Sequence, residues 1–378
     1  MEKDKILIYL EQHMDDLLQM LKEVVELESP DHENKITSDK CSRYLCSMFA
    51  KLGFDMETIP QSTCGDHLYG ELGNGEKSAI IVGHYDTVFP IGTLEKMPFK
   101  IEGNKAYGPG ILDMKGGLVM AYFAIKAIQD LNMMPDNKTI GIFMNSDEES
   151  GSFCSSDLII EKAKKYKCAF VMEPGVDGIG SVKMKRFGRG TYTVKAIGKE
   201  AHSGSNPNLA VSPIMEIAHQ LLGIAEWDRN EEDATLAPTV IRGGIDGTCV
   251  IPREASFTMD VRYKTEKTAA RVHREIMELA AIDKRCRIAV KGKIDKPVMV
   301  GDEELYQRFE RLAQEYDVEL DRITVGGGSD GNFTAAAGIP TLDGLGMSGE
   351  FLHNVKEYVH IDHIPVRTAM FARLLRSI

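Results

Sequence analysis

The chain has 378 residues, of which 43% are hydrophobic, and it carries a formal charge of −12. Its length exceeds the ~100–200 residues of a typical domain, which predicts two domains or one domain with a large insertion. The acidic balance, with short basic runs only at 162–167 and 183–189, argues against nucleic acid as a partner, and the absence of a long apolar run argues against a membrane span. The seven cysteines form no C-x-x-C pair, which favours reduced thiols in a cytoplasmic protein.

The first half of the chain has the pattern of an α/β domain. Residues 1–28 carry apolar side chains at helical spacing, which predicts an amphipathic helix and not a secretory signal. Predicted strands lie at 79–83, 139–144 and 168–172, and predicted helices lie between them at 116–131 and 155–166. This alternation predicts a mostly parallel sheet, and such sheets bind ligands at the carboxyl ends of their strands.

The pattern changes after about residue 180. A strand, a helix, two strands, a helix and a strand follow, at 191–197, 210–224, 239–243, 255–263, 267–281 and 287–293. This is the β-α-β-β-α-β order of a ferredoxin-like unit. From residue 297 the chain returns to the first domain with a helix at 303–316, a strand near 340–342 and a last helix near 365–375. We therefore predict a discontinuous domain of residues 1–180 and 294–378, and an inserted domain of residues 181–293.

His84 and Asp86 lie two residues apart where the strand at 79–83 ends. Positions i and i+2 of a strand face the same way, so the carboxylate is placed to orient an imidazole that binds a metal. In a chain with ten histidines the pair alone fits a chance placement on the surface better. Other candidate ligands have to decide between the two interpretations.

Further acidic and imidazole side chains follow predicted strands or lie in glycine-rich turns. They are Asp113 before the helix at 116–131, Glu148 and Glu149 after the strand at 139–144, Glu173 after the strand at 168–172, and His353 in a late glycine-rich loop. Taken singly, Asp113 fits a helix N-cap equally well, and the D-E-E run at 147–149 fits a solvated loop better. Together, two imidazoles and three carboxylates suit zinc, and also manganese or cobalt. Two ions with about three protein ligands each require one bridging carboxylate, as in two-metal hydrolases.

With these residues in this order, the sequence resembles the co-catalytic zinc metallopeptidases that include carboxypeptidase G, aminoacylase-1, peptidase T and succinyl-diaminopimelate desuccinylase. The motifs are G-H-Y-D-T-V (83–88), G-P-G-I-L-D-M-K-G-G (108–117), D-E-E-S-G-S (147–152), M-E-P (172–174), A-H-S-G (201–204), G-G-G-S-D-G-N (326–332) and the late His353. The ordered set covers nearly the whole chain and is most similar in look to carboxypeptidase G, a glutamate carboxypeptidase. The resemblance implies a mostly parallel-sheet zinc-exopeptidase catalytic domain with an inserted ferredoxin-like lid and dimerisation domain.

The resemblance also implies a site with two zinc ions per chain. Asp113 would bridge the ions, His84 and Glu173 would complete one ligand set, and Glu149 and His353 would complete the other. The peptide bond after Asp113 would be cis.

The resemblance assigns the chemistry to residues next to these ligands. Glu148 would be the general base, which takes a proton from the metal-bridging water and delivers it to the leaving amine, and Asp86 would orient His84. His202 would reach the active site of a partner subunit in a homodimer formed through the lid domain and stabilise the oxyanion. By itself, His202 fits a surface loop residue.

Substrate residues are implied in the second half of the chain. Arg262 would bind the substrate carboxylate as a planar bidentate donor, although a surface ion pair is an alternative. The turn with Gly326, Gly327, Gly328 and Asn332 would contribute to the same carboxylate site. It lacks the lysine and spacing of a phosphate-binding loop, which argues against a nucleotide-binding protein. Cys249 departs from the family, where an asparagine that contacts substrate is usual.

The sequence thus predicts a metallopeptidase or amidohydrolase that cleaves a peptide or amide bond adjacent to a free carboxylate, as a carboxypeptidase G-like exopeptidase. An N-acyl amino acid deacylase and a di/tripeptidase are the alternatives, and each takes a small peptide or an N-acyl amino acid. A non-catalytic binding protein is disfavoured, because such a protein need not retain Glu148 and all five ligands.

Overall fold

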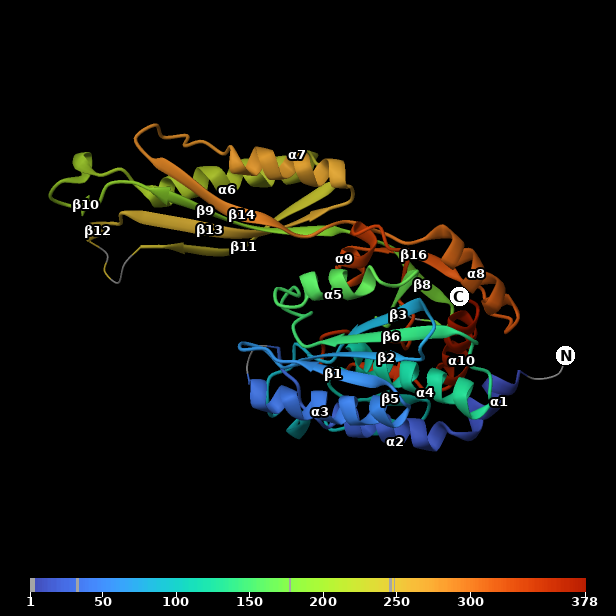
Figure 1. Ribbon diagram of the computed structural model, residues 1–378. Helices are drawn as coiled ribbons and strands as arrows, with labels where there is room; N and C mark the ends of the chain where they lie inside the picture. The colour runs from blue at the N-terminus through green and yellow to red at the C-terminus, as the bar shows by residue number, and fades with distance from the viewer. Residues whose placement is uncertain (1–3, 32–33, 177, 245–246, 248) are drawn as a thin grey trace. The chain divides into compact units, whose positions relative to one another are not determined.

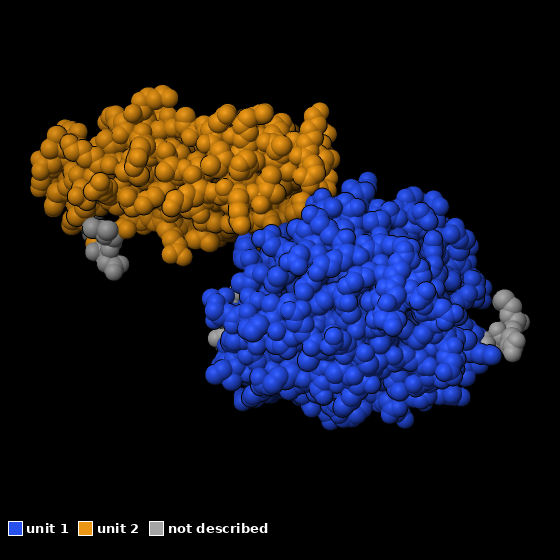
Figure 2. Space-filling view, viewed as in Figure 1, with its two compact units in different colours: residues 1–185, 299–325, 329–378 blue, residues 186–298, 326–328 orange. Residues whose placement is uncertain are grey.

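The computed structural model describes residues 4–31, 34–176, 178–244, 247 and 249–378. The chain divides into two compact units, shown in blue and orange in Figure 2. Unit 1 consists of Met1–Lys185, Met299–Val325 and Ser329–Ile378, and unit 2 consists of Arg186–Val298 and Gly326–Gly328. The inserted domain was predicted at 181–293. Unit 2 begins and ends five residues later, at 186 and 298, and also includes the three-glycine turn.

Unit 1 is built on a nine-stranded mixed sheet with the order β1-β2-β6-β3-β7-β17-β8-β15, in which β16 also pairs with β8. The strands are β1 (Asp55–Ile59), β2 (His67–Leu72), β3 (Glu76–His84), β6 (Lys138–Asn145), β7 (Cys168–Val171), β8 (Ser181–Arg186), β15 (Met299–Val300), β16 (Asp321–Val325) and β17 (Thr341–Asp343). The four central strands β6, β3, β7 and β17 are parallel to one another, while β1–β2, β2–β6 and β17–β8 are antiparallel pairs. The expected parallel strands therefore form the centre of a sheet with antiparallel flanks.

Helices cover both faces of this sheet, as Figure 1 shows. They are α1 (Lys5–Gln12), α2 (Met14–Val25), α3 (Lys35–Lys51), α4 (Gly116–Asp130), α5 (Ser156–Ala163), α8 (Glu303–Gln314), α9 (Gly331–Ala336) and α10 (His363–Arg376). Alternate residues of β3 pack on opposite faces: Ala79 and Ile81 belong to the large core with α4 and α10, and Ile80 and Val82 pack with α5. A strand buried on both faces has no polar alternation, which is why β3 reads as a continuous apolar run.

The predicted single helix at 1–28 is wrong in one respect, because the structure breaks it at His13. This residue has φ −109° and ψ 20°, outside the helical region, and separates α1 from α2. Its imidazole stacks on the Tyr9 ring, with 3.9 Å between the ring centroids, and Nδ1 lies 2.8 Å from the Tyr9 carbonyl oxygen. The helical periodicity of the apolar residues continues across this break, so the sequence pattern does not reveal it.

The parallel strands bring three chain segments to one edge of the sheet. In the strand register His84 at the end of β3 pairs with Asn145 at the end of β6, and Val82 pairs with Val171 at the end of β7. The residues that follow these strands therefore start next to one another. A four-stranded antiparallel sheet, β18-β19-β5-β4, supports the same unit with β4 (Lys100–Glu102), β5 (Lys105–Tyr107), β18 (Gly349–Glu350) and β19 (Tyr358–His360).

Unit 2 has the expected ferredoxin-like arrangement. Its antiparallel sheet has the order β11-β13-β9-β14, with β9 (Gly188–Ile197), β11 (Ala234–Gly243), β13 (Glu254–Tyr263) and β14 (Arg287–Lys296). The helices α6 (Pro213–Asn230) and α7 (Glu266–Met277) lie on one side of this sheet (Figure 1). Burial alternates strictly along β9 and β13, because one face packs on the helices and the other does not. A short ribbon pairs β10 (Ala201–His202) with β12 (Val250–Ile251).

Two composition-based expectations concern membranes and thiols. Among the described helices, none combines the length and the apolar character that a membrane crossing requires. None of the seven cysteines forms a disulfide, and four of them are buried.

Candidate metal centre

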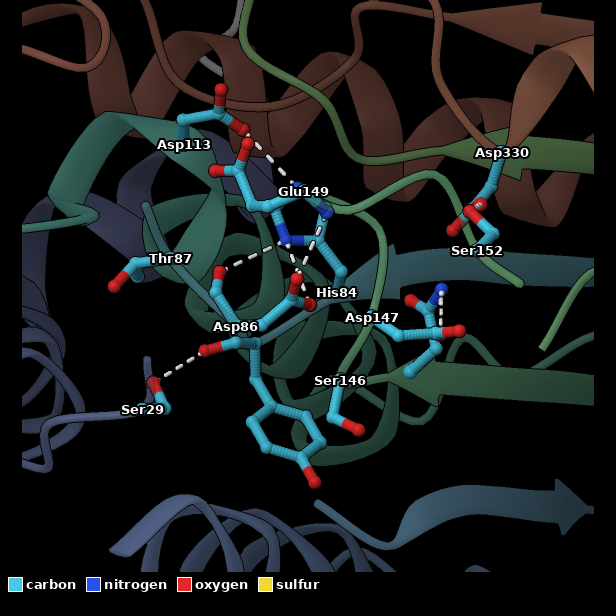
Figure 3. Close-up of polar contacts among 12 residues, drawn as sticks. Ser29, His84, Asp86, Thr87, Asp113, Ser146, Asp147, Glu149, Ser152 and Asp330 are labelled. Atoms are coloured by element: carbon cyan, nitrogen blue, oxygen red, sulfur yellow. Dashed lines mark hydrogen bonds and ion pairs between the residues drawn. The ribbon is translucent and has the colours of Figure 1, made fainter. Parts of the chain in front are cut away.

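The first group of candidate ligands surrounds His84. Its Nε2 lies 3.2 Å from Asp113 Oδ1 and 3.5 Å from Glu173 Oε1. His84 ends β3, Glu173 follows β7, and Asp113 lies in the turn before α4, so the group joins three elements around the same sheet edge. Figure 3 shows the carboxylate of Asp113 close to the imidazole of His84.

The second group shares Asp113 with the first. His353 Nε2 lies 3.1 Å from Asp113 Oδ2 and 3.3 Å from Glu149 Oε2. Asp113 thus presents one carboxylate oxygen to each imidazole, and the ligand atoms of each group lie within 4.8 Å of one another. The structure brings together all five predicted ligands in the arrangement of two triads joined by one carboxylate.

The turn that carries Asp113 is held by a residue that the sequence did not single out. Glu357 is buried, and its Oε1 accepts hydrogen bonds from the backbone N–H groups of Leu112, at 2.8 Å, and Asp113, at 3.1 Å. The peptide bond between Asp113 and Met114 is cis, as expected. Glu357 lies four residues after His353 in H-N-V-K-E, and this proximity is the only sequence feature that could have indicated it.

Asp86 contacts both halves of the centre. His84 Nδ1 lies 3.0 Å from the main-chain oxygen of Asp86 and 3.4 Å from its carboxylate Oδ1. The other carboxylate oxygen accepts the N–H of Glu149 at 2.9 Å. The imidazole is therefore positioned mainly by the Asp86 carbonyl, while the buried carboxylate fixes the backbone of the opposite ligand.

The loop after β6 carries Glu148 and Glu149 and is held from within. Asp147 Oδ2 accepts the N–H groups of Cys154, at 2.6 Å, and Ser155, at 3.3 Å. Ser152 donates to Asp330 Oδ1 at 2.6 Å, as Figure 3 shows. Glu148 is only 8% exposed. The D-E-E run is therefore a folded, buried loop and not a solvated one, because Asp147 satisfies the loop backbone.

The charges of the centre are concentrated in a poorly solvated space. Burial and the charge of Asp113 raise the pKa of Glu149 to about 8. Hydrogen bonds to Asp113 and Glu149 raise the pKa of His353 to about 11. Burial disfavours a charged His84, but the carboxylates of Asp86, Asp113 and Glu173 outweigh burial and raise its pKa. Several carboxylates in one buried place require compensating positive charge.

A pair of metal ions would supply that charge, and the donors fit. Bonds of about 2.0–2.2 Å to zinc in tetrahedral geometry separate neighbouring ligand atoms by roughly 3.4 Å, close to the observed separations. Glu149 Oε1 is buried without a hydrogen-bond partner among the described residues, as expected for a ligand oxygen facing a cation. Imidazole nitrogen and carboxylate oxygen are the donors preferred by zinc, cobalt and manganese.

His202, the predicted oxyanion donor, lies in unit 2. It is exposed at the end of β10, and its Nδ1 accepts the N–H groups of Gly204, at 3.1 Å, and Ser205, at 3.0 Å. A ring nitrogen that accepts hydrogen bonds carries no proton, so the neutral imidazole is protonated at Nε2. The ring is thereby set to donate a hydrogen bond from Nε2.

Arg262 and the glycine turn come together within unit 2. The guanidinium binds Asp260 through Nε, at 2.6 Å, and Nη2, at 3.2 Å, while Nη1 donates to the Gly326 carbonyl at 3.2 Å. The alternative of a surface ion pair for Arg262 is thus what this structure contains. Arg189 also donates to Asp260, at 2.8 Å, so this carboxylate is shared between two arginines.

A second arginine that the sequence did not single out binds the same turn. Arg186 is buried, and its Nη1 donates to the carbonyls of Gly327, at 3.2 Å, and Gly328, at 3.1 Å. Arg186 lies in the short basic run at 183–189, and nothing in the sequence distinguished it from the other basic residues of that run.

The remaining predicted substrate positions differ in their surroundings. Asn332 is buried in unit 1 at the start of α9, where its Oδ1 accepts the Ser329 N–H at 2.8 Å. Cys249 is exposed in unit 2, and its carbonyl accepts the Ser203 N–H at 2.8 Å, next to His202. Asn332 therefore has a structural role in its turn, while Cys249 lies on the same ribbon as His202.

Comparison with known proteins finds a family profile and relatives that match most of the chain. The sequence profile of peptidase family M20/M25/M40 matches residues 80–377. The chain is 32% identical to carboxypeptidase G2 of Pseudomonas sp. (strain RS-16) over 322 residues, which covers 83% of this chain and 77% of that protein. It is 26% identical to succinyl-diaminopimelate desuccinylase of Thioalkalivibrio sulfidiphilus (strain HL-EbGR7) over 389 residues, which covers 97% and 99%.

The fold has solved counterparts. Aminopeptidase PepT from Bacillus cereus superposes with a TM-score of 0.78 at 21% identity, covering 96% of this chain and 98% of that one. At this level of identity the likeness concerns the fold alone.

Proposed function

The chain belongs to peptidase family M20/M25/M40, whose relatives are metal-dependent peptidases and amidohydrolases, and from this premise we propose that it cleaves a peptide or amide bond adjacent to a free carboxylate. The preferred substrate class is that of a carboxypeptidase G-like exopeptidase. One observation carries this proposal: Asp113 presents one oxygen to His84 Nε2 at 3.2 Å and the other to His353 Nε2 at 3.1 Å. A carboxylate shared in this way is suited to bridging two cations.

The ligand assignment follows from the two triads. Asp113 would bridge the two ions, His84 and Glu173 would complete one ligand set, and Glu149 and His353 would complete the other. Zinc is the preferred ion, and cobalt and manganese suit the same donors. When bound, two such ions acidify a water between them and polarise the scissile carbonyl.

Glu148 is the proposed general base. It shares the folded loop of Glu149, and its burial keeps bulk water from competing for the proton that it transfers. Its carboxylate accepts a proton from the attacking water and delivers that proton to the leaving amine as the tetrahedral intermediate collapses. Asp86 is a positioning residue, because it fixes the His84 ring and the Glu149 backbone.

His202 is the proposed donor to the oxyanion. Its Nδ1 is occupied by two backbone N–H groups, which leaves the Nε2–H available for a carbonyl oxygen that gains negative charge. We assign this role to the partner subunit's His202 in a homodimer formed through unit 2.

The surface of unit 2 supports a homodimer. Strand β11 is an edge of its sheet and exposes Val240 and Ile241, and α6 exposes Met215 and Leu222. An open strand edge beside exposed apolar side chains favours pairing with a second copy. We expect Leu222→Glu combined with Ile241→Lys to shift the protein to a monomer in light scattering and to reduce hydrolysis. A monomeric variant with full activity would contradict the role of the partner.

Arg262 is the proposed anchor for the substrate carboxylate. It already holds a carboxylate, that of Asp260, in the bidentate geometry that a substrate would use. Asp260 also accepts a hydrogen bond from Arg189, so it keeps one arginine partner if Arg262 leaves it to bind the substrate carboxylate. N-acyl amino acids and di- or tripeptides also carry a free carboxylate that Arg262 could bind, so deacylation and di/tripeptide cleavage are the alternative activities. Seven cysteines outside disulfides fit a reducing, cytoplasmic location for this activity.

Two measurements test the proposal. Metal analysis of the zinc-loaded protein should find at least two ions per chain, and a value near zero would exclude the centre. Glu148→Gln should retain those ions but lose hydrolysis by about 10²–10⁴-fold, while Glu161→Gln, at the exposed end of α5, should leave both unchanged. Retained hydrolysis in Glu148→Gln would remove this residue as the base.

A substrate panel then decides the class. N-acyl glutamates, other N-acyl amino acids, dipeptides and their C-terminal amides should be compared by kcat/KM. We expect the free acids to be cleaved and the amides to fail, with glutamate preferred. Equal cleavage of acids and amides would contradict carboxylate recognition.

A further inference from the structure

A second cluster of metal-ligand side chains lies outside the centre described above. His360 ends β19, and Asp362 and His363 begin α10; their ligand atoms lie within 4.8 Å of one another. The centroids of the two imidazole rings are 4.7 Å apart. We propose that His360, Asp362 and His363 form an additional binding site for a zinc-class divalent transition ion.

The His363 ring is oriented by its own hydrogen-bond partner. Its Nδ1 lies 2.8 Å from the hydroxyl oxygen of Ser348. With Nδ1–H donating to that oxygen, Nε2 carries the lone pair, and it is Nε2 that faces Asp362 Oδ1. Metal-binding histidines commonly have such a partner on the nitrogen that does not bind the ion, because it fixes the tautomer and the ring.

The backbone of the cluster is held by neighbouring elements. The N–H of His360 donates to the Ser348 carbonyl at 3.0 Å, and the N–H groups of Ile361 and Asp362 donate to the main chain and side chain of Asn104 at 2.9 and 3.0 Å. Asn104 lies between β4 and β5. Two neighbouring segments, at Asn104 and Ser348, thus fix the turn that presents the donors, so little ordering is needed when an ion binds.

The placement of the Asp362 carboxylate distinguishes this site from an ordinary helix start. Asp362 occupies the N-cap of α10, yet its side chain makes no capping hydrogen bond. Its Oδ1 lies 3.8 Å from His363 Nε2, too far for a hydrogen bond but close to the roughly 3.4 Å that separates two ligands of one zinc ion. The space between these atoms therefore suits a cation better than a direct contact.

The chemistry of the donors limits the ion. Two imidazoles and one carboxylate form a mixed nitrogen and oxygen set, which zinc, nickel and copper bind better than magnesium or calcium. Asp362 is 61% exposed, so water can complete the coordination and the ion can exchange with solvent. The ion would connect the end of β19 to the start of α10.

A difference in zinc stoichiometry tests the site. Wild-type protein, His363→Asn and Asp362→Asn are dialysed against the same buffered free zinc, and the ions bound per chain are counted by mass spectrometry. We expect each variant to bind one ion fewer than wild type, while His219→Asn, at an exposed position on α6, binds the wild-type number. Equal stoichiometry in wild type and both variants, or an equal loss in His219→Asn, would overturn the proposal.

Asp362→Asn changes an exposed side chain that makes no capping hydrogen bond, so we expect this variant to fold normally. A lost ion in Asp362→Asn would therefore not be explained by misfolding. Copper provides a second readout: the electron paramagnetic resonance spectrum of the copper-titrated protein should lose one population of nitrogen-coordinated ion in His363→Asn. The result does not depend on the ions at Asp113, because the readout is a difference between proteins that share that centre. Failure of the hydrolase proposal would leave this difference unchanged.

Discussion

Replacing Arg367 by methionine should destabilise unit 1, although this residue lies outside the metal centre. Arg367 is 2% exposed in α10 and donates to backbone carbonyls of two loops: those of Gly346 and Ile179, both at 2.6 Å, and that of Gly344, at 2.8 Å. The Gly346 N–H in turn donates to the Glu173 carbonyl at 2.8 Å. Arg367 thus connects the C-terminal helix to the segment that carries a candidate ligand.

The magnitude follows from the bonds lost and the charge removed. Three short hydrogen bonds to a charged donor contribute about 1.5–3 kcal/mol each. Burial lowers the pKa of Arg367 to about 10, and relief of this desolvation in the methionine variant returns roughly 3 kcal/mol. We expect a net destabilisation of ~2–6 kcal/mol, which corresponds to a fall in Tm of about 5–15 °C for a domain of this size.

Differential scanning calorimetry of metal-free protein measures this effect. Arg376→Met is the matched control, since Arg376 lies in the same helix but donates to a carbonyl, that of Met133, from an exposed position. The control should change Tm by no more than about 2 °C. Arg367→Lys should fall between the two, because an ammonium group cannot span all the carbonyls. If Arg367→Met and Arg376→Met have the same Tm, the buried guanidinium does not stabilise these loops.

Three further predictions concern other named contacts. Glu357→Leu should weaken zinc binding at Asp113 by about 10–100-fold in a chelator competition, because it leaves two backbone N–H groups unsatisfied. Glu357→Gln keeps an acceptor and should bind zinc more tightly than the leucine variant, and equal zinc affinities of the two variants would exclude a positioning role. Arg262→Gln should raise KM for substrates with a free carboxylate while leaving zinc content unchanged, and an unaltered KM would contradict its role as anchor. Burial opposes a charged Glu216, but hydrogen bonds from Gln220 and two backbone N–H groups outweigh it and lower its pKa, so its stabilising effect is present above about pH 4.3 and is lost as the pH falls through the folded-state pKa. The difference in Tm between wild type and Glu216→Gln should therefore be largest near pH 7 and shrink as the pH falls below about 4.3, and a difference that stays constant there would show that this carboxylate is not the cause.

The sequence predicted the strands that position the centre because they are buried on both faces. The apolar runs at 79–83, 139–144 and 168–172 lie within β3, β6 and β7 or extend one residue beyond, and the polar residues after them meet at one edge. The same reasoning missed the break at His13, where a ring stacked on Tyr9 interrupts a helix whose apolar periodicity continues. Periodicity reports which side chains are buried but not local backbone departures.

Residue types and order were enough to predict the candidate ligands that the fold brings together, but not the residues that hold them in place. His84, Asp113, Glu149, Glu173 and His353 have the donors that zinc prefers, and their motifs occur in a recognisable order. Glu357 and Arg367 were not singled out from the sequence, because a carboxylate or guanidinium that binds backbone groups can occupy many sequence positions. Their contacts span 244 residues for Glu357 with Asp113 and 188 for Arg367 with Ile179.

The sequence by itself determined the family and the two-part architecture of this protein, and it predicted candidate donors for a pair of ions. Only the tertiary structure decided how Asp113 divides its two oxygens between His84 and His353, that Arg262 is already paired with Asp260, and that His360, Asp362 and His363 converge. The physical reason is that donor identity is a property of single residues. Distance, burial and hydrogen-bond satisfaction arise only when segments far apart in the chain pack together.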